Sequence, residues 1–171
     1  MAAGQKRCFV GLWPDATAAE QLASLACALG REYPQARHVV RENLHLTLAF
    51  IGNLADEPAQ RVARRLRTVA VTPFQWTVDR IGSFPGPRVG WAGGATPPAL
   101  QALVAAVQVL LDDEHVPFDR RPFVPHVTLL RHLPRAAALA RPISPPILWQ
   151  AGTPVLLQSE AGRYKQIVPA T

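Results

Sequence analysis

The feature that most constrains this chain is a five-residue pattern that occurs twice. Residues 44–48 read LHLTL, and 81 residues later residues 125–129 read PHVTL. Alternate side chains of an extended strand share one face, so each segment places a histidine and a threonine on one side and apolar residues on the other. A polar face on an otherwise apolar strand needs partners for both groups. We therefore expect two amphipathic strands, one in each half of the chain.

Helical and strand patterns alternate along the rest of the sequence, which favours an α+β protein over a doubly wound parallel sheet. Capping-box spacing at Thr17 and Glu20 predicts the start of the first helix, and Thr96 is the expected N-cap of the third. Residues 134–146, rich in Ala, Arg and Pro, are expected to form a loop. Helices are predicted at 17–31, 56–70 and 97–114, and strands at 7–12, 37–51 (a short and a long one), 74–93 (two, around a turn), 123–130, 154–158 and 164–168.

Composition limits the class of protein. The 171 residues are 49% hydrophobic and 18% charged, which suits a soluble single domain, residues 1–171, of two closely packed lobes. No apolar run reaches the length of a membrane span, and the N-terminus lacks the pattern of a signal peptide, so we expect a cytoplasmic protein. Cys8 and Cys27 are too few for a disulfide framework or a cysteine-rich zinc site.

The net charge of +6 comes almost wholly from arginine, since Lys6 and Lys165 are the only lysines. Arginine suits bidentate contact with phosphate, but a basic balance alone leaves a nucleic-acid or nucleotide partner undecided. The arginines within residues 61–67 are interpreted as a solvated helix face rather than an RNA contact. No GxGxxG or GxxxxGK[ST] motif supports a dinucleotide or P-loop site.

Two His-x-Thr pairs fit cleavage of a phosphodiester. A neutral imidazole can take a proton from an attacking water while a protonated one gives a proton to the leaving oxygen, and histidine titrates close enough to neutrality for both states. Threonine hydroxyls can donate hydrogen bonds to the non-bridging oxygens. Taken singly, each histidine also fits a half-buried structural residue. A zinc site built on His45 and His126 would need a third ligand that the motifs do not supply.

The sequence resembles the 2H phosphoesterase superfamily in its two motifs, within RENLHLTLAFIGNL (41–54) and RRPFVPHVTLLR (120–131). Its flanks RCFVGLWP, FPGPRVGWAG and LLQSEAGRY are similar to the bacterial RNA 2′,3′-cyclic phosphodiesterase branch. The resemblance implies two antiparallel sheets facing a groove, with helices outside. It also implies hydrolysis of a 2′,3′-cyclic phosphate to a 2′-phosphomonoester without metal or cofactor. By position, His45 would be the proton donor, His126 the proton acceptor, and Thr47 and Thr128 phosphate ligands.

The same resemblance places an aromatic residue and an arginine five positions after the histidines. These are Phe50, expected to stack on a base, and Arg131, expected to bind phosphate. Strict strand alternation puts both on the face opposite the histidines, so reaching the site requires a bulge or a strong twist. Otherwise Phe50 is a core residue and Arg131 a surface residue.

The expected partner is RNA with a 2′,3′-cyclic phosphate end, or a cyclic nucleotide, bound by a monomer that does not associate with membranes. Two alternatives stay open. One is a different substrate within the superfamily, such as a 2′-5′ linkage, a cyclic ADP-ribose phosphate, or RNA ends joined by reversal of hydrolysis. The other is a module that binds RNA ends without turnover.

Overall fold

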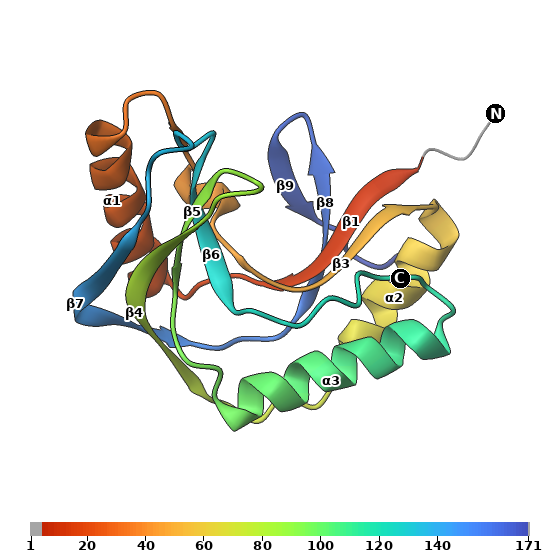
Figure 1. The fold of residues 1–171 in the computed structure, drawn as a ribbon. Helices are drawn as coiled ribbons and strands as arrows, with labels where there is room; N and C mark the ends of the chain where they lie inside the picture. Colours follow the sequence, from red (N-terminus) through yellow and green to blue (C-terminus); the bar gives the residue numbers. More distant parts are fainter. Residues whose placement is uncertain (1–4, 171) are drawn as a thin grey trace.

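Two antiparallel sheets, assembled from strands far apart in the sequence, form the centre of the computed structural model, which describes residues 5–170 (Figure 1). The first sheet has the order β3 (Leu46–Leu54), β1 (Lys6–Leu12), β8 (Val155–Glu160), β9 (Arg163–Gln166). The second has the order β2 (Arg37–His38), β6 (His126–Arg131), β5 (Val89–Gly93), β4 (Gln75–Phe84), β7 (Ala140–Gln150). Each sheet therefore carries one of the two motifs, where the chain enters β3 and where it enters β6. The predicted α+β class with two antiparallel sheets is confirmed.

The helices cross between the lobes. Helix α1 (Ala16–Glu32) follows β1 of the first sheet but packs on β6 and β7 of the second. Helix α3 (Pro98–Asp113) follows β5 of the second sheet but packs on β3 of the first, beside α2 (Asp56–Leu66), which covers β8. All three lie on the outside of the sheets (Figure 1). Because each sheet is covered by a helix from the other half of the chain, the lobes interlock.

The apolar face of each motif strand lies in the core, as the alternation predicts. Leu44, Leu46 and Leu48 are at most 3% exposed, and Val127 and Leu129 are fully buried. Burying a side chain of this size stabilises the fold by about 1.5–3 kcal/mol. The histidine and threonine side of each strand is thereby fixed toward the groove.

Two predicted helix caps are wrong. The N-cap of α1 is Asp15, whose Oδ1 accepts a hydrogen bond from the Ala18 amide at 3.0 Å, so Thr17 lies inside the first turn. Asp15 also accepts from the Gln150 amide through Oδ2, which ties the helix start to β7. Helix α3 has Pro97 as its N-cap residue, and it lacks a side-chain cap because proline carries no side-chain acceptor; Pro98 at N1 already has the helical φ.

The loop predicted for residues 134–146 is also wrong in part, since β7 begins at Ala140. Its prolines are tolerated because β7 is an edge strand that pairs only with β4, so a missing amide hydrogen need not interrupt a ladder. Within residues 5–170, no helix is long and apolar enough to cross a membrane. Residues 1–4, the start of the N-terminal segment judged to lack a signal-peptide pattern, lie outside the described residues.

Candidate active site

The first motif strand is bulged directly after its threonine. Gly11 pairs with Thr47 and Val10 pairs with Ala49, so Leu48 has no partner across the ladder. Leu48 and Ala49 are consequently both buried, and the alternation restarts one residue later. Phe50, 37% exposed, therefore lies on the same side of β3 as Thr47.

The second motif strand repeats this irregularity. Trp91 pairs with Thr128 and Gly90 pairs with Leu130, which leaves Leu129 without a partner. Leu129 and Leu130 are both fully buried, and Arg131 returns to the groove side. Strict alternation would have placed Phe50 and Arg131 on the face opposite the histidines. The two bulges shift the alternation by one residue and bring both side chains to the groove.

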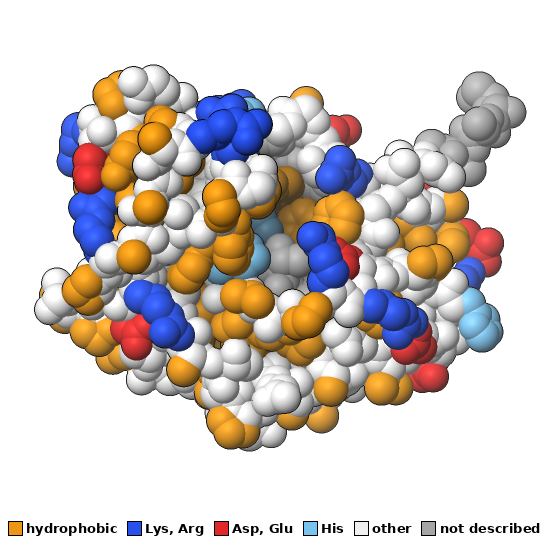
Figure 2. Space-filling view, in the orientation of Figure 1, with side chains coloured by type: hydrophobic (Ala, Val, Ile, Leu, Met, Phe, Trp, Pro, Cys, Tyr) orange, Lys and Arg blue, Asp and Glu red, His pale blue; other side chains and the backbone are white. Residues whose placement is uncertain are grey.

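One pocket of about 360 Å³ collects most of the predicted site residues from both sheets. His45, Thr47 and Phe50 enter it from the first sheet, and Thr128 and Arg131 from the second. His126 lies beside the pocket on β6 rather than in its lining, and its charge still acts on His45. Figure 2 shows pale-blue histidine atoms at the bottom of a central hollow between the lobes. The full lining is Arg7, Phe9, His45, Thr47, Phe50, Thr128, Arg131, Ser159 and Tyr164.

Both imidazoles are held by the same type of contact. The Nδ1 atom of His45 lies 2.7 Å from the carbonyl oxygen of Asn43, and Nδ1 of His126 lies 2.7 Å from that of Val124, in each case two residues upstream. A carbonyl only accepts, so Nδ1 carries the hydrogen and Nε2 exchanges protons. Nε2 of His45 lies 3.0 Å from Thr47 Oγ1. In the neutral state this Nε2 accepts a hydrogen bond from the hydroxyl.

The electrostatics of the groove favour neutral imidazoles. The pKa of His45 is lowered to about 4, chiefly by burial; the Asn43 hydrogen bond opposes this effect, and the positive charges of Arg131 and His126 add to it. Burial also lowers the pKa of His126. At pH 7 both histidines of the unliganded protein can accept a proton, and an anion in the pocket would favour their charged form.

Aromatic rings surround His45 on several sides. The Phe9 ring centroid lies 4.7 Å from that of the imidazole, and the Tyr164 ring meets it edge-on at 4.9 Å. Trp13 lies edge-on at 6.4 Å. The Tyr164 hydroxyl accepts a hydrogen bond from Arg131 Nη2 at 3.1 Å, which joins the two sheets across the pocket. These rings account for the burial that lowers the pKa of His45.

Sequence reasoning missed Arg7, Phe9, Ser159 and Tyr164 as pocket residues. They come from β1, which pairs with β3, and from β8 and β9, which follow β1 in the same sheet. Their segments belonged to the flanks that resemble the family, but no spacing rule marked these particular side chains.

Asn43 connects the first motif to the last hairpin. Its backbone carbonyl holds His45, while its side-chain Nδ2 donates to the Gly162 carbonyl at 2.8 Å and its Oδ1 accepts from the Tyr164 amide at 3.1 Å. One residue thus fixes the imidazole and, through the hairpin backbone, the ring beside it.

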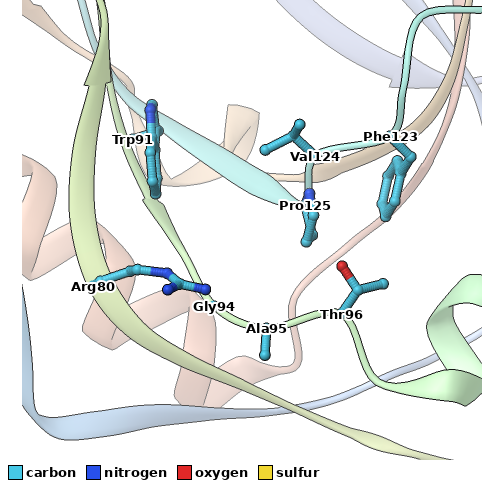
Figure 3. A pocket seen from close by; sticks show the side chains of 8 residues that line it. All are labelled: Arg80, Trp91, Gly94, Ala95, Thr96, Phe123, Val124 and Pro125. Atoms are coloured by element: carbon cyan, nitrogen blue, oxygen red, sulfur yellow. The ribbon is translucent and has the colours of Figure 1, made fainter.

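On the second sheet, Trp91 lies on the groove face beside the second motif, because it is paired with Thr128. A Cβ at Gly82, its partner on β4, would lie 2.1 Å from the Trp91 ring, so only glycine leaves room for the indole. Phe84 packs on Trp91 and meets the His126 ring edge-on at 5.0 Å. Trp91 and Arg80 also line a neighbouring pocket, next to the backbone of Val124 and Pro125 (Figure 3).

Comparison with known proteins settles the family. Residues 12–91 match the sequence model described as "LigT like Phosphoesterase". An RNA 2′,3′-cyclic phosphodiesterase of Methanothermobacter thermautotrophicus is 30% identical over 133 residues, 73% of this chain and 70% of that relative. The chain belongs to the LigT-like phosphoesterase family. The resemblance drawn from the paired motifs is thereby confirmed.

Other LigT-like phosphoesterases agree in sequence and fold. An RNA 2′,3′-cyclic phosphodiesterase of Escherichia coli is 33% identical over 109 residues, 62% of this chain and 61% of that relative, so this match spans less than two thirds of the relative's length. The crystal structure of E. coli LigT complexed with 3′-AMP superposes with a TM-score of 0.82 at 26% identity, covering 96% of each chain. The bilobal arrangement of the two sheets is therefore shared with a LigT-like protein of known structure.

Proposed function

We propose that this protein hydrolyses terminal 2′,3′-cyclic phosphodiesters of RNA to 2′-phosphomonoesters. The observation that carries the proposal is the pair of imidazoles, one from each sheet, each with Nδ1 fixed on a carbonyl and Nε2 left for proton exchange. Relatives from E. coli and M. thermautotrophicus are named RNA 2′,3′-cyclic phosphodiesterase, and E. coli LigT has been crystallised with 3′-AMP. The pocket of this chain has a volume of about 360 Å³, within the range of small-molecule sites.

In the proposed reaction, His126 Nε2 takes a proton from a water whose oxygen attacks phosphorus. The bond between phosphorus and the 3′ oxygen breaks, and protonated His45 gives its Nε2 proton to that oxygen, which leaves a 2′-phosphate and a 3′-hydroxyl. His126 ends protonated and His45 neutral, so a proton exchange with solvent restores the starting state. No further reactant is needed.

Charge in the pocket assists this sequence. The Thr47 and Thr128 hydroxyls and the Arg131 guanidinium line the pocket and would hold the non-bridging oxygens. His45, whose pKa is about 4 in the unliganded protein, must be charged to act as the acid. The bound phosphate supplies the opposite charge that raises this pKa, so the acid forms where the substrate lies.

Phe50 is the proposed stacking residue for the terminal base. The Arg7 guanidinium lies 5.2 Å from the centre of its ring and covers one face, so a base would stack on the other. Phe50 and the phosphate ligands line one pocket, as binding of a single nucleotide requires.

The test is hydrolysis of 2′,3′-cyclic AMP and of an oligonucleotide with a cyclic phosphate end, in EDTA, with separation of 2′- and 3′-phosphate products. His45→Ala and His126→Ala should each lower kcat by about 10²–10⁴-fold, the usual contribution of general acid or base catalysis. The matched control is His115→Ala, because His115 is exposed and follows the C-terminal end of α3, away from the groove. Full activity in either motif variant, or binding of RNA ends without turnover, would contradict the proposal.

A further inference from the structure

The arginines of this chain divide into ion-paired and unpaired sets. Several on the outer surface contact carboxylates: Arg61 and Arg65 of α2 pair with Glu114, and Arg141 pairs with Glu32. Within residues 5–170, no carboxylate lies within 4.0 Å of the arginines around the groove. This unpaired groove set is Arg7, Arg37, Arg131 and Arg163.

A second cleft, of about 360 Å³, opens beside the catalytic pocket and shares Arg131, Ser159 and Tyr164 with it. Arg37 enters this cleft from β2 of the second sheet and Arg163 from β9 of the first. Figure 2 shows a blue Lys/Arg patch above the central hollow, between the lobes. A chain whose end sits in the catalytic pocket could therefore continue between two arginines on opposite walls. We refer to this feature as the arginine cleft.

Two of these arginines are forced together by the sheet. Arg37 and Arg131 are register partners in the β2–β6 ladder, directly across from each other. Like charges at directly opposed positions destabilise a sheet. No carboxylate of residues 5–170 lies within 4.0 Å of either guanidinium, so an anion could neutralise the two charges.

The position of Arg163 is fixed by its hairpin. Ala161 and Gly162 both have positive φ, 49° and 77°, which closes the tight turn between β8 and β9. Asn43 bonds to the backbone of Gly162 and Tyr164 on either side of Arg163. The backbone that carries Arg163 is thus anchored, so that binding of a ligand need not order it.

We infer that the arginine cleft binds the phosphodiester backbone on the 5′ side of the terminal nucleotide, so that an RNA chain is a better substrate than a mononucleotide. This inference rests on the proposed function. The opposite end of the groove is less suited to a polyanion: its pocket holds one arginine, Arg80, which lies 3.8 Å from the carboxylate of Asp79 (Figure 3). Arginine forks suit bidentate contact with phosphates, and a positively charged groove can follow the backbone of a single strand.

The experiment compares a tetranucleotide ending in a 2′,3′-cyclic phosphate with 2′,3′-cyclic AMP. In the wild-type protein kcat/KM should be higher for the tetranucleotide, and Arg37→Gln and Arg163→Gln should each lower the ratio of the two kcat/KM values about 5–10-fold. Arg67→Gln, on the exposed surface just beyond α2, is the matched control and should leave the ratio unchanged. A plot of log KM for the tetranucleotide against log salt concentration should have a slope that is smaller by about 0.7 for each phosphate that the variant no longer neutralises.

A binding measurement separates failure of this inference from failure of the proposed function. The anisotropy of a labelled tetranucleotide ending in a 2′-phosphate reports Kd without turnover. Weaker binding in Arg37→Gln and Arg163→Gln, but not in Arg67→Gln, supports the arginine cleft even if the wild-type protein hydrolyses neither substrate. Equal binding by all four proteins, or a kcat/KM ratio that neither cleft variant changes, would overturn it.

Discussion

Proton uptake on anion binding is the most direct test of how the groove sets the charge of His45. With a pKa of about 4, roughly one His45 imidazole in a thousand is protonated at pH 7. Sulfate, which does not titrate in this range, places a negative charge where the substrate phosphate is proposed to bind. If sulfate restores the pKa to its ordinary value of 6.5 or above, binding takes up about 0.9 proton at pH 5.5.

The same linkage fixes the pH dependence of affinity. Between the unliganded pKa, about 4, and the liganded one, the Kd for sulfate rises about tenfold for each unit of pH, because the charged imidazole binds the anion better. Across this window the affinity falls by roughly two orders of magnitude. Above the liganded pKa the dependence on His45 ends.

Isothermal titration calorimetry in two buffers of different ionisation enthalpy measures the uptake. His45→Asn should remove most of one proton, and what remains reports on His126, whose pKa is also lowered by burial. His115→Asn, exposed and outside the groove, should take up as many protons as the wild type. Uptake below about 0.3 proton at pH 5.5 in the wild type, or undiminished uptake in His45→Asn, would refute the reasoning.

Three further predictions concern the groove walls. Gly82→Ala should lower the free energy of unfolding in urea by about 1–3 kcal/mol, since its Cβ would collide with Trp91. The control Gly86→Ala, whose Cβ would lie in open space, should not show this loss, and equal stabilities of the two variants would count against the packing described. Phe50→Leu should lower kcat/KM for 2′,3′-cyclic AMP about tenfold relative to the base-free glycerol 1,2-cyclic phosphate, and an unchanged ratio would exclude stacking. Ala161→Asn should raise the unfolding free energy by about 0.5–1 kcal/mol, because asparagine tolerates positive φ better than alanine; no gain in the urea midpoint would disprove this.

The motif strands were predictable because one side of each is fully buried. Alternation of Leu44, Leu46 and Leu48 specifies which way His45 and Thr47 face, and burial of the leucines enforces it. Alternation also predicts that Phe50 points away from the groove, and here a bulge changes the outcome. A bulge depends on how a strand pairs with its neighbour, so the sequence of β3 by itself does not reveal it.

The remaining pocket residues depend on strand order, which local patterns do not contain. Tyr164 lies beside His45 because β8 pairs with β1 and β9 with β8, although 119 positions separate the two residues in the chain. The position of Arg7 likewise follows from the central place of β1 in its sheet. The prolines of β7 were misleading for a similar reason. They predicted a loop, but an edge strand tolerates proline, and whether a strand lies at an edge is known only from the assembled sheet.

The strand order of the first sheet has a consequence for biosynthesis. β1 is synthesised well before β8 and β9, which complete its sheet and bring Tyr164 to His45. A nascent chain that ends before Val155 contains both motif histidines but lacks this wall of the pocket. The pocket with Tyr164 in its lining is therefore complete only once β9 has been synthesised and has paired with β8.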